Sequence, residues 1–503
     1  MYIWFGLWVL WAAAESVLYS LGSYRVLSRM SVRACVVVLL CIGLVVTDVA
    51  LLVHNRWWIL AVLLTPYRLV NLVRFARYRL RPERLSSVCL RSHGWLAVAQ
   101  VVFGATGWAL HLVPFVSVMG FLAGVQFLVA LVLLRASMST WEHAKPVDIS
   151  QHYTDKELPT MSVLIPARDE TDALQRCLDS LIRNDYPKLE IIVLDDCSLD
   201  RRTPEIIRGY AHDGVRFIQG NVPPNDWVAK NFAYEQLRNE ASGELLLFCG
   251  VDTEFESRTL RALVEAMLLR GKDMVSVLPT RTESGQRTLS ILQTMRYYWE
   301  LCLPRRLFKR PPVLSTCWLV RASQLEDLGG FSSVSQSVSP EAHFARRSVV
   351  GGAYTFLRTF GDVQVHSGKT FDEQYETTVR LRYPQLHRRL ELVAATVLFE
   401  LIFFVGPFVS IPLSVFLPHS LAFLSVWLIC VLTVEVMYYL IAVQTKLHSP
   451  LVAFASAPLA FAADIYMLHM SMLRYEFGTV NWKGRNVCIP VMRVEPSLPK
   501  LPE

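Results

Sequence analysis

The chain has 503 residues, of which 53% are hydrophobic and only 18% are charged. Ordinary soluble domains carry roughly 25% charged residues, so this composition excludes a chain made of water-soluble domains alone. The formal net charge of +7 suits a membrane surface, and nothing in the sequence indicates nucleic-acid binding.

Apolar stretches long enough to cross a hydrocarbon core of about 30 Å lie at the two ends of the chain. From the N-terminus, the predicted spans are residues 2–21, 34–53, 57–73, 95–112 and 115–134. The first has no basic segment before its apolar core, which argues against a cleaved signal peptide. We therefore predict an N-terminal transmembrane region of about five spans over residues 1–136.

Arginines between these spans predict the orientation. The loop after the first span holds Arg25, Arg29 and Arg33, and the loop after the third holds Arg74, Arg77, Arg79, Arg81, Arg84 and Arg91. The loops after the second and fourth spans are short and nearly uncharged. Because positively charged loops stay cytoplasmic, we expect a multi-pass cell-membrane protein with its N-terminus outside and its central domain in the cytoplasm.

Three further apolar stretches follow the central region, at residues 392–417, 420–443 and 450–473. The last contains Pro450, Pro458, Asp464 and His469, and the tail after it contains Arg474, Lys483, Arg485 and Arg493. A helix in the membrane interface fits these residues better than a full crossing, and it leaves the basic tail cytoplasmic. We predict transmembrane or interfacial helices over residues 391–474 and a cytoplasmic tail over residues 475–503.

The central domain is predicted over residues 137–390. Apolar runs of strand length alternate there with longer amphipathic stretches, as in "MSVLIPARDE", "YPKLEIIVLDDCSLD" and "GELLLFCGVDT". This alternation indicates βαβ units around a buried parallel sheet, in which ligands bind at the carboxyl ends of the strands. The residues expected to share that rim are Arg168, Glu170, Asp195, Asp196 and Asp252.

Acidic residues on such a rim suit the binding of a nucleotide sugar. Asp195 and Asp196 are candidates to accept hydrogen bonds from a base and a ribose. Asp252 is a candidate ligand for a divalent metal that bridges a diphosphate, since such hard cations prefer oxygen ligands. The alternative interpretation is that these aspartates only cap turns and helices.

Five segments in order resemble the membrane-bound family-two glycosyltransferases: "VLIPARDE", "YPKLEIIVLDDCSLDRRT", "DWVAKNFAYEQLRNEASGELLLFCGVDT", "LEDLGGF" and "VNWKGRNV". They are most similar to the branch that includes ceramide glucosyltransferase and hopanoid- or carotenoid-linked sugar transferases. The resemblance implies a GT-A fold and a UDP- or GDP-type sugar donor. It also implies manganese or magnesium as cofactor, and inverting transfer to a lipid or a growing polymer.

The resemblance also implies roles for particular residues. Pro166, Ala167, Arg168 and Glu170 correspond to the first nucleotide contacts, Asp196 to the base-binding acid, Lys230 to the lysine near the phosphates, and Asp252 to the metal-binding second acid of the D-x-D motif. Three motifs depart from the family pattern. Gly250 replaces the first acid of D-x-D, Ala342 replaces the aspartate of the E-D motif, and Thr377 and Thr378 replace the arginine and tryptophan of Q-x-x-R-W.

Glu341 and Gln374 remain from the two altered catalytic motifs and are the candidate catalytic residues. Glu341 is a candidate general base, with His343 as the alternative, and Arg380 or Arg382 is a candidate for the charge of the missing arginine. The stretch "YYWELCLPRRLFKRPP", residues 297–312, is predicted to rest on the membrane, either to admit a lipid acceptor or as a plain anchor.

The sequence therefore predicts an integral-membrane glycosyltransferase that uses a nucleotide sugar and a lipid-linked or hydrophobic acceptor. The runner-up is a catalytically inactive relative that serves as partner or scaffold of an active transferase. A channel-forming polymer synthase is a weaker third interpretation, because that mechanism depends on the altered Q-x-x-R-W element.

Overall fold

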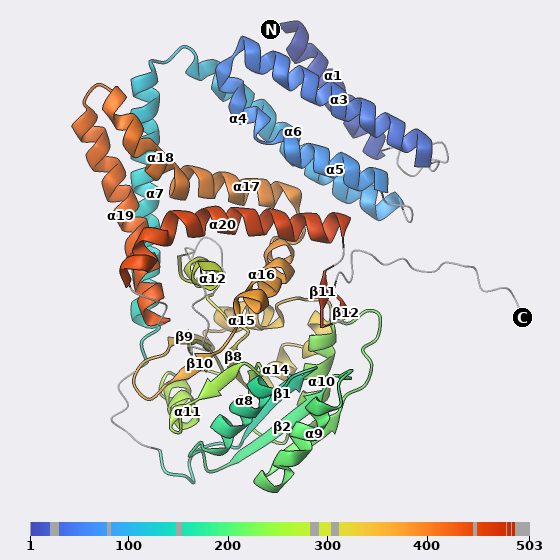
Figure 1. Ribbon diagram of the computed structural model, residues 1–503, viewed down its shortest axis with the longest axis vertical. Helices are drawn as coiled ribbons and strands as arrows, with labels where there is room; N and C mark the ends of the chain where they lie inside the picture. The colour runs from blue at the N-terminus through green and yellow to red at the C-terminus, as the bar shows by residue number, and fades with distance from the viewer. Residues whose placement is uncertain are drawn as a thin grey trace, which may run out of the picture.

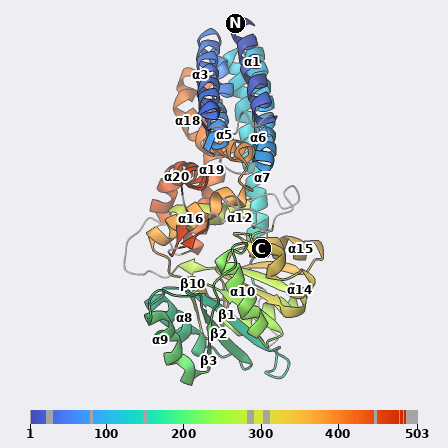
Figure 2. The ribbon, with the colours of Figure 1, turned by 90° about the vertical axis from the view of Figure 1, so that its right-hand side faces the viewer.

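The computed structural model describes residues 2–20, 30–77, 82–146, 153–281, 291–302, 311–445, 450–478, 480–483 and 485–487. A mixed α/β domain lies at one end of the molecule, and long apolar helices lie at the other (Figure 1). Figure 2 shows the same division from the side. The apolar helices come from both sides of the α/β domain in the sequence, as predicted.

Within the described residues, seven strands form the central sheet in the order β3–β2–β1–β4–β8–β6–β9. Their bounds are β1 Met161–Ala167, β2 Leu189–Asp195, β3 Val215–Gln219, β4 Leu245–Cys249, β6 Met274–Leu278, β8 Cys317–Arg321 and β9 Tyr354–Arg358. The pairs β3–β2, β2–β1 and β1–β4 are parallel, and β9 is parallel to β6. β8 runs antiparallel between β4 and β6, so the prediction of a parallel sheet was wrong for this strand.

The strands lack polar alternation because both faces of the sheet are covered. Val163 and Ile165 of β1 pack in one apolar layer with helices α8 (Asp172–Ile182) and α11 (Thr259–Leu269). Leu164, between them, packs on the opposite face with α10 (Ala229–Glu240) and α15 (Pro340–Val350). Successive side chains on a strand point to opposite faces, so a sheet buried on both faces needs apolar residues at every position.

A small second sheet, in the order β5–β10–β7, lies beyond the end of β4. It consists of β5 (Thr253–Phe255), β10 (Val365–Ser367) and β7 (Thr280–Arg281). Ser367 of β10 pairs with Thr253 of β5, directly after Asp252. This pairing brings the segment around residue 367 to the end of β4, although more than a hundred residues separate the two in the chain.

Six helical segments of the described chain are long and apolar enough to cross a membrane: Tyr2–Ser20, Val32–His54, Arg56–Arg77, Phe115–His143, Leu390–Phe416 and Ser420–Gln444. They correspond to six of the predicted apolar stretches. Two further long helices fall outside this set: α6 (Pro82–Leu110) contains residues 95–110 of the predicted stretch 95–112, and α20 (Pro450–Phe477) contains the stretch 450–473. In Figure 1, α20 runs across α7 (Phe115–His143) and α19 (Ser420–Gln444), between the sheet domain and the N-terminal helices.

Buried polar pairs connect the N-terminal helices. Arg68 donates to Glu15 at 2.6 Å and to Gln100 at 2.6 Å, and His93 lies 3.0 Å from Glu15. These four residues come from α1 (Tyr2–Ser20), α5 (Thr65–Arg77) and α6. A buried charge is tolerated only when paired, so these contacts account for the polar residues inside an apolar helix bundle.

Candidate functional site

The expected rim of the sheet exists in the structure. Ala167 and Asp195 are register partners at the ends of β1 and β2. On the other side of β1, Leu164 pairs with Phe248 of β4, so Asp252 follows that strand at about the level of Arg168. The topology thus brings the side chains that follow β1, β2 and β4 to one edge of the sheet, as the pattern of the sequence predicts.

Pro166 and Ala167 define the end of β1 through their backbone. Ala167 is buried, and its carbonyl accepts a hydrogen bond from the backbone N–H of Asp196 at 2.7 Å. Pro166 is half-buried and pairs with Leu194 of β2. These two residues therefore position the neighbouring polar groups, while their own side chains offer no hydrogen bond to a ligand.

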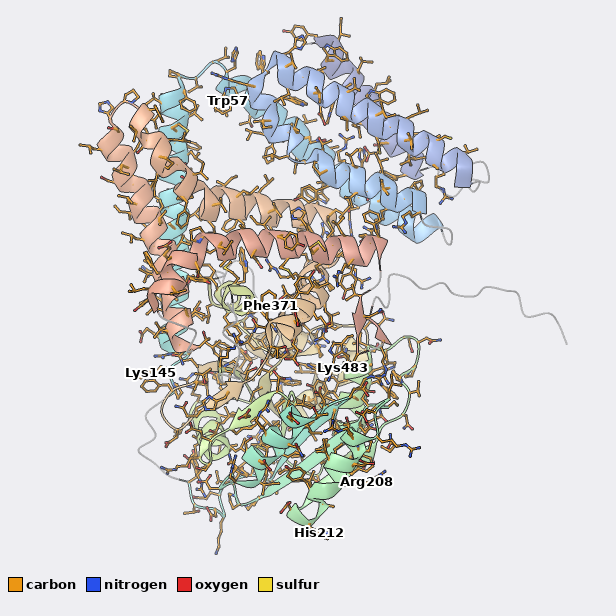
Figure 3. All side chains as sticks on the ribbon, viewed as in Figure 1. Trp57, Lys145, Arg208, His212, Phe371 and Lys483 are labelled. Carbon is orange, nitrogen blue, oxygen red and sulfur yellow. The ribbon has the colours of Figure 1, made fainter. Side chains whose placement is uncertain are left out.

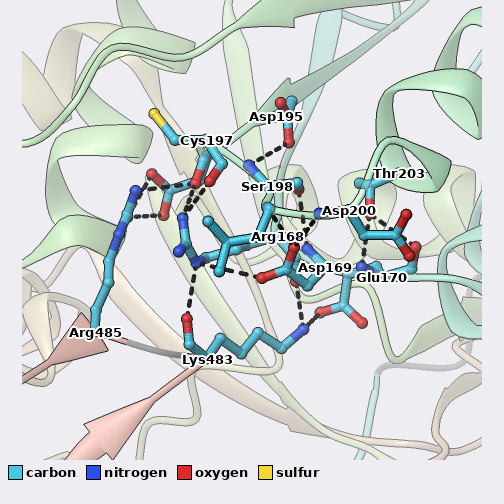
Figure 4. Close-up of polar contacts among 12 residues, drawn as sticks. Arg168, Asp169, Glu170, Asp195, Cys197, Ser198, Asp200, Thr203, Lys483 and Arg485 are labelled. Carbon is cyan, nitrogen blue, oxygen red and sulfur yellow. Dashed lines mark hydrogen bonds and ion pairs between the residues drawn. The ribbon is translucent and has the colours of Figure 1, made fainter.

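Arg168 holds the loop that follows β2 through hydrogen bonds to its backbone. Its Nη1 donates to the carbonyl of Asp196 at 2.7 Å and to that of Cys197 at 2.5 Å. Its Nε donates to the carbonyl of Lys483 at 3.0 Å (Figure 4). The guanidinium is nearly buried, so it fixes the backbone on which Asp195 and Asp196 are presented.

Asp195 and Asp196 have different surroundings. Asp195 accepts from the backbone N–H of Ser198 at 3.1 Å and from Gln219 Nε2 at 2.8 Å, the pattern of a carboxylate that caps its own loop. Asp196 instead accepts from Arg485 Nη1 at both carboxylate oxygens, each at 2.7 Å. Burial raises the pKa of Asp196, and its contact with Arg485 opposes that shift.

A hairpin near the C-terminal end of the described chain covers this part of the rim. It comprises β11 (Asn481–Trp482) and β12 (Arg485–Asn486). Lys483 Nζ donates to the carbonyl of Arg168 at 2.7 Å and forms an ion pair with Glu170. Figure 4 shows Lys483 and Arg485 meeting the rim from one side, and Figure 3 places Lys483 at the junction of the sheet domain with the helices above it.

Sequence reasoning missed Lys483 and Arg485 as site residues. The motif "VNWKGRNV" entered only as part of the family resemblance, and these cations only as a basic tail. The available signal was the coincidence of two cations in a recognised motif with unpaired acids on the predicted rim. The contact of Arg485 with Asp196 joins residues that are more than 280 positions apart in the chain, and no local sequence pattern specifies such a contact.

Asp252 lies after β4, at the entrance to β5. Its carboxylate accepts from Ser367 Oγ at 3.0 Å and lies 3.8 Å from Lys369 Nζ. A Cβ at position 250 would lie 2.6 Å from Asp252 Oδ1, so the carboxylate occupies the space that a side chain at 250 would need. The glycine in "GVD" therefore fits the observed rotamer, and an acid at position 250 would require Asp252 to rotate.

The described residues contain no group of three or more His, Cys, Asp or Glu side chains arranged to hold a metal ion. Asp252 alone offers one hard oxygen donor, which does not make a complete protein site. One carboxylate does fit a metal whose remaining ligands are diphosphate oxygens and water, because magnesium-type ions are commonly bound that way. The donor set thus suits a cation that arrives with its nucleotide.

Lys230 and Glu341 interact electrostatically beside the rim. Burial lowers the pKa of Lys230 to about 8, although Glu341 acts in the opposite direction. Burial also raises the pKa of Glu341, which Lys230 opposes, and this carboxyl is only 3% exposed. Within the described part of the chain, Glu341 Oε2 has no hydrogen-bond partner. It is therefore a buried acid with an available oxygen, as a general base requires.

Helix α16 (Phe371–Gln385) carries the altered Q-x-x-R-W element. Gln374 is buried, its Nε2 donates to the carbonyl of Lys369 at 3.1 Å, and its Oε1 has no hydrogen-bond partner among the described residues. Gln374 thus supports the segment that carries Lys369, which is itself close to Asp252.

The two candidate arginines of α16 have different neighbours. Arg380 lies over the ring of Trp482, 5.1 Å from its centroid, and interacts electrostatically with Glu341 and Lys230. Arg382 instead pairs with Glu400 at 3.3 Å and with Asp464. Of the two arginines, Arg380 is therefore the one near Lys230 and Glu341, and Arg382 belongs to the contact with the membrane-side helices.

His343, the alternative base, is exposed and packs its ring against Phe344. Burial lowers the pKa of His343, and Arg347 and Arg346 add to that effect. Its charged neighbours are arginines, whereas Glu341 is the group that interacts with Lys230. The stretch 297–312 was predicted to rest on the membrane. Its residues 297–302 form the end of α12 (Ile291–Cys302), and its basic residues, within 303–310, lie outside the described chain.

Residues 162–329 match the family model "Glycosyl transferase family 2". The probable glycosyltransferase YdaM of Bacillus subtilis (strain 168) is 30% identical over 185 residues, which cover 35% of this chain and 44% of YdaM. The GalNAc(5)-diNAcBac-PP-undecaprenol beta-1,3-glucosyltransferase of Campylobacter jejuni is 31% identical over 111 residues, which cover 22% of this chain and 34% of that protein. Both matches span less than half of the relative's length.

Among solved structures, the mannosyltransferase PcManGT from Pyrobaculum calidifontis, in complex with GDP-Man and Mn2+, aligns with a TM-score of 0.44 and 15% identity. That alignment covers 71% of this chain and 97% of PcManGT. The family match coincides with β1 to β4, β6 and β8 and with the rim described above. Residues 162–329, which match the family 2 model, therefore form most of the mixed α/β domain, and this part of the chain is called the family 2 domain below.

Proposed function

We propose that this protein is an integral-membrane glycosyltransferase that transfers a sugar from a UDP- or GDP-type donor to a lipid-linked or hydrophobic acceptor. The observation that carries the proposal is the convergence of Asp196, Asp252, Lys230 and Glu341 on one edge of the family 2 domain, next to helices apolar enough to enter a membrane. Ligand-binding groups at strand ends are what this class of fold uses.

In this proposal the donor lies along the rim. Asp196 accepts hydrogen bonds from the base or ribose once Arg485 releases or shares its carboxylate, and Asp195 supports the same loop. Asp252 would hold a manganese or magnesium ion, and such an ion would neutralise charge on the diphosphate. Lys230 and Arg380 supply further positive charge for the leaving diphosphate, in place of the arginine missing from Q-x-x-R-W.

Transfer follows as a direct displacement. Glu341 takes the proton of an acceptor hydroxyl, whose oxygen forms a bond to the anomeric carbon of the sugar. The bond between that carbon and the diphosphate oxygen breaks, and its electron pair leaves with the nucleoside diphosphate. The burial of Glu341 supports this role, because a raised pKa makes the carboxylate a stronger base.

We propose a hexosyl donor, an acceptor related to those of the ceramide glucosyltransferase and hopanoid or carotenoid branch, and a cytoplasmic catalytic domain. The YdaM and Campylobacter relatives are named as glycosyltransferases, which favours an enzyme over the inactive scaffold.

The orientation rests on the arginine-rich loops. Labelling of His212→Cys by an impermeant reagent in intact cells would contradict it, because His212 is exposed at the far tip of the domain (Figure 3).

The test of donor binding is a titration of the purified protein with UDP, GDP and their hexose conjugates, with and without Mn²⁺, followed by thermal unfolding. A ligand that binds only the folded state raises the unfolding temperature. We expect stabilisation by one nucleotide class, increased by Mn²⁺. The proposal fails if no nucleotide stabilises the protein at millimolar concentration.

A further inference from the structure

Glu341 lines a cavity of about 440 Å³ between α12, α15 and the end of α16. We infer that this cavity binds the headgroup of a lipid acceptor that carries a phosphate group, rather than a neutral lipid headgroup. The inference rests on the proposed transfer of a sugar to a lipid acceptor, and it selects a phosphate-bearing lipid in place of the neutral ceramide- or hopanoid-type acceptors named above.

Three chain segments and Val313 form the walls. The first segment is α12, the second runs from residue 336 into α15, and the third is the end of α16 with the turn after it, residues 384–388. That turn is followed directly by α17 (Leu390–Glu400), which begins the apolar segment Leu390–Phe416. The cavity therefore lies where a headgroup would reach the domain while its lipid chain stays beside an apolar helix.

The cavity is rich in arginine. Arg296 of α12, Arg346 of α15 and Arg388 of the turn all line it, together with His343 and His387. The acidic residues in the lining are Glu300 and Glu341. The three guanidinium groups outnumber the two carboxylates, so an anionic group would balance the charge of the walls.

Two of these arginines have buried N–H groups without acceptors. Arg388 is only 8% exposed, and within the described chain its Nη1 has no hydrogen-bond partner. The same holds for Arg296 Nε, although Arg296 Nη2 reaches Ser315 Oγ at 3.4 Å. Buried donors are almost always satisfied, so each orphan group indicates an acceptor that is absent from the polypeptide itself.

Arg388 is also held in a specific place. Its guanidinium lies 4.3 Å from the ring centroid of Tyr475 on α20. Arg388 and the preceding His387 both have positive φ, 53° and 54°, a conformation that non-glycine residues rarely adopt. Such backbone strain persists where the surroundings impose it and is common at ligand sites. The turn thus presents a preorganised guanidinium to the cavity.

A phosphate satisfies this arrangement better than a neutral group does. Guanidinium and phosphate form charge-assisted, often bidentate hydrogen bonds, whereas a hydroxyl or amide leaves the arginine charges unpaired. Held by Arg296 and Arg388, a phosphate would leave the acceptor's hydroxyl to face Glu341, which lines the same cavity. The geometry therefore favours a lipid phosphate or diphosphate as the carrier of that hydroxyl.

The test uses the full-length protein in a neutral detergent, with farnesyl phosphate and farnesol as matched probes that differ in the phosphate. Binding is measured by calorimetry for the wild type and for Arg388→Gln and Arg296→Gln. Arg347→Gln is the control, because Arg347 is on the same helix as Glu341 but does not line the cavity. UDP and GDP binding with Mn²⁺ is measured on every variant.

We expect the wild type to bind farnesyl phosphate at least tenfold more tightly than farnesol. Each cavity variant should lose about tenfold in affinity for farnesyl phosphate and keep its affinity for farnesol, since one charged hydrogen bond has about that effect. Arg347→Gln should resemble the wild type. Arg388→Lys keeps the positive charge but not the bidentate geometry of the guanidinium, so its affinity for farnesyl phosphate should fall several-fold. This variant replaces Arg388→Gln in the test if the glutamine variants fail to fold.

Equal affinity for the two probes, or unchanged affinity in the cavity variants, would overturn the inference. So would equally tight binding of phosphatidylglycerol, a phosphodiester that would mark a site for bulk membrane lipid. If farnesyl phosphate binds in an arginine-dependent way but no nucleotide binds, the proposed function is wrong and the cavity is an anion site only. If nucleotides bind but farnesyl phosphate does not bind through the arginines, the inference about the cavity is wrong and the proposed donor site stands.

Discussion

Arg485 donates to both carboxylate oxygens of Asp196 at 2.7 Å and so joins the hairpin after α20 to the loop after β2. The Asp196 side chain is 4% exposed and that of Arg485 is 19% exposed, so the pair is largely shielded from water. A membrane-side helix is thereby connected to the group that the proposal assigns to the nucleotide.

The first prediction concerns the stability of this connection. Arg485→Ala should lower the free energy of unfolding by about 1.5–3 kcal/mol, the usual effect of losing hydrogen bonds to a charged, buried group. Thermal unfolding in one detergent measures it. The control is Arg216→Ala, whose pair with Glu190 involves an arginine that is 46% exposed and should contribute less than about 1 kcal/mol. If both changes lower the free energy of unfolding equally, the pair of Arg485 with Asp196 contributes no more to stability than an exposed ion pair does.

The second prediction concerns the metal. Asp252→Asn should abolish the part of nucleotide affinity that depends on Mn²⁺ and leave the metal-free affinity nearly unchanged, because the amide is a poorer ligand for a hard cation. Calorimetric titration with and without Mn²⁺ measures both values. Asp213→Asn, at an exposed aspartate far from the rim, is the control. If Asp252→Asn retains the full Mn²⁺ dependence, Asp252 is not the metal ligand.

The third prediction follows from Lys230, whose pKa is lowered to about 8 by burial. Its ammonium is present below that pH and is lost as the pH rises through it. Since a diphosphate favours the charged form, nucleotide diphosphate affinity should fall as the pH is raised from about 7 to 9, by at most about tenfold per unit. In Lys230→Met the affinity should be lower and flat over this range. A wild-type profile that is also flat would exclude Lys230 from the phosphate site.

The fourth prediction separates the two arginines of α16. Arg380→Gln should weaken nucleotide diphosphate binding about tenfold with little change in unfolding temperature, since Arg380 stands beside Lys230 and Glu341. Arg382→Gln should do the opposite, because it removes the cation that pairs with Asp464 and with the buried Glu400. Nucleotide titration and thermal unfolding of both variants distinguish the roles. Identical behaviour of the two variants would contradict the assignment.

The fold and the acidic rim could be predicted because they depend on local pattern. The apolar runs that end in Ala167, Asp195 and Cys249 indicate parallel strands, and parallel strands align their carboxyl ends. The antiparallel β8 could not be recognised, because its run "CWLVR" is as apolar as the others. A strand buried on both faces has the same pattern in either direction.

The remaining parts of the site depend on contacts over long stretches of chain. Nothing near Asp196 in the sequence specifies Arg485, and nothing near Glu341 specifies Arg388. The sequence also left open whether Arg380 or Arg382 supplies the charge of the missing arginine. The two lie two residues apart on a helix and so point in different directions, but the pattern does not say which direction faces the site.

The most direct test of the central claim is sugar transfer by the wild type and by Glu341→Gln. Purified protein is incubated with Mn²⁺, radiolabelled UDP- and GDP-hexoses and a bacterial lipid extract, and label is counted in the organic phase. The account predicts transfer by the wild type and a 10²- to 10⁴-fold lower rate in Glu341→Gln, with unchanged nucleotide affinity. Adding an acid by Ala342→Asp should change the rate little. Wild-type turnover in Glu341→Gln, or no transfer from any donor by the wild type, would contradict the account.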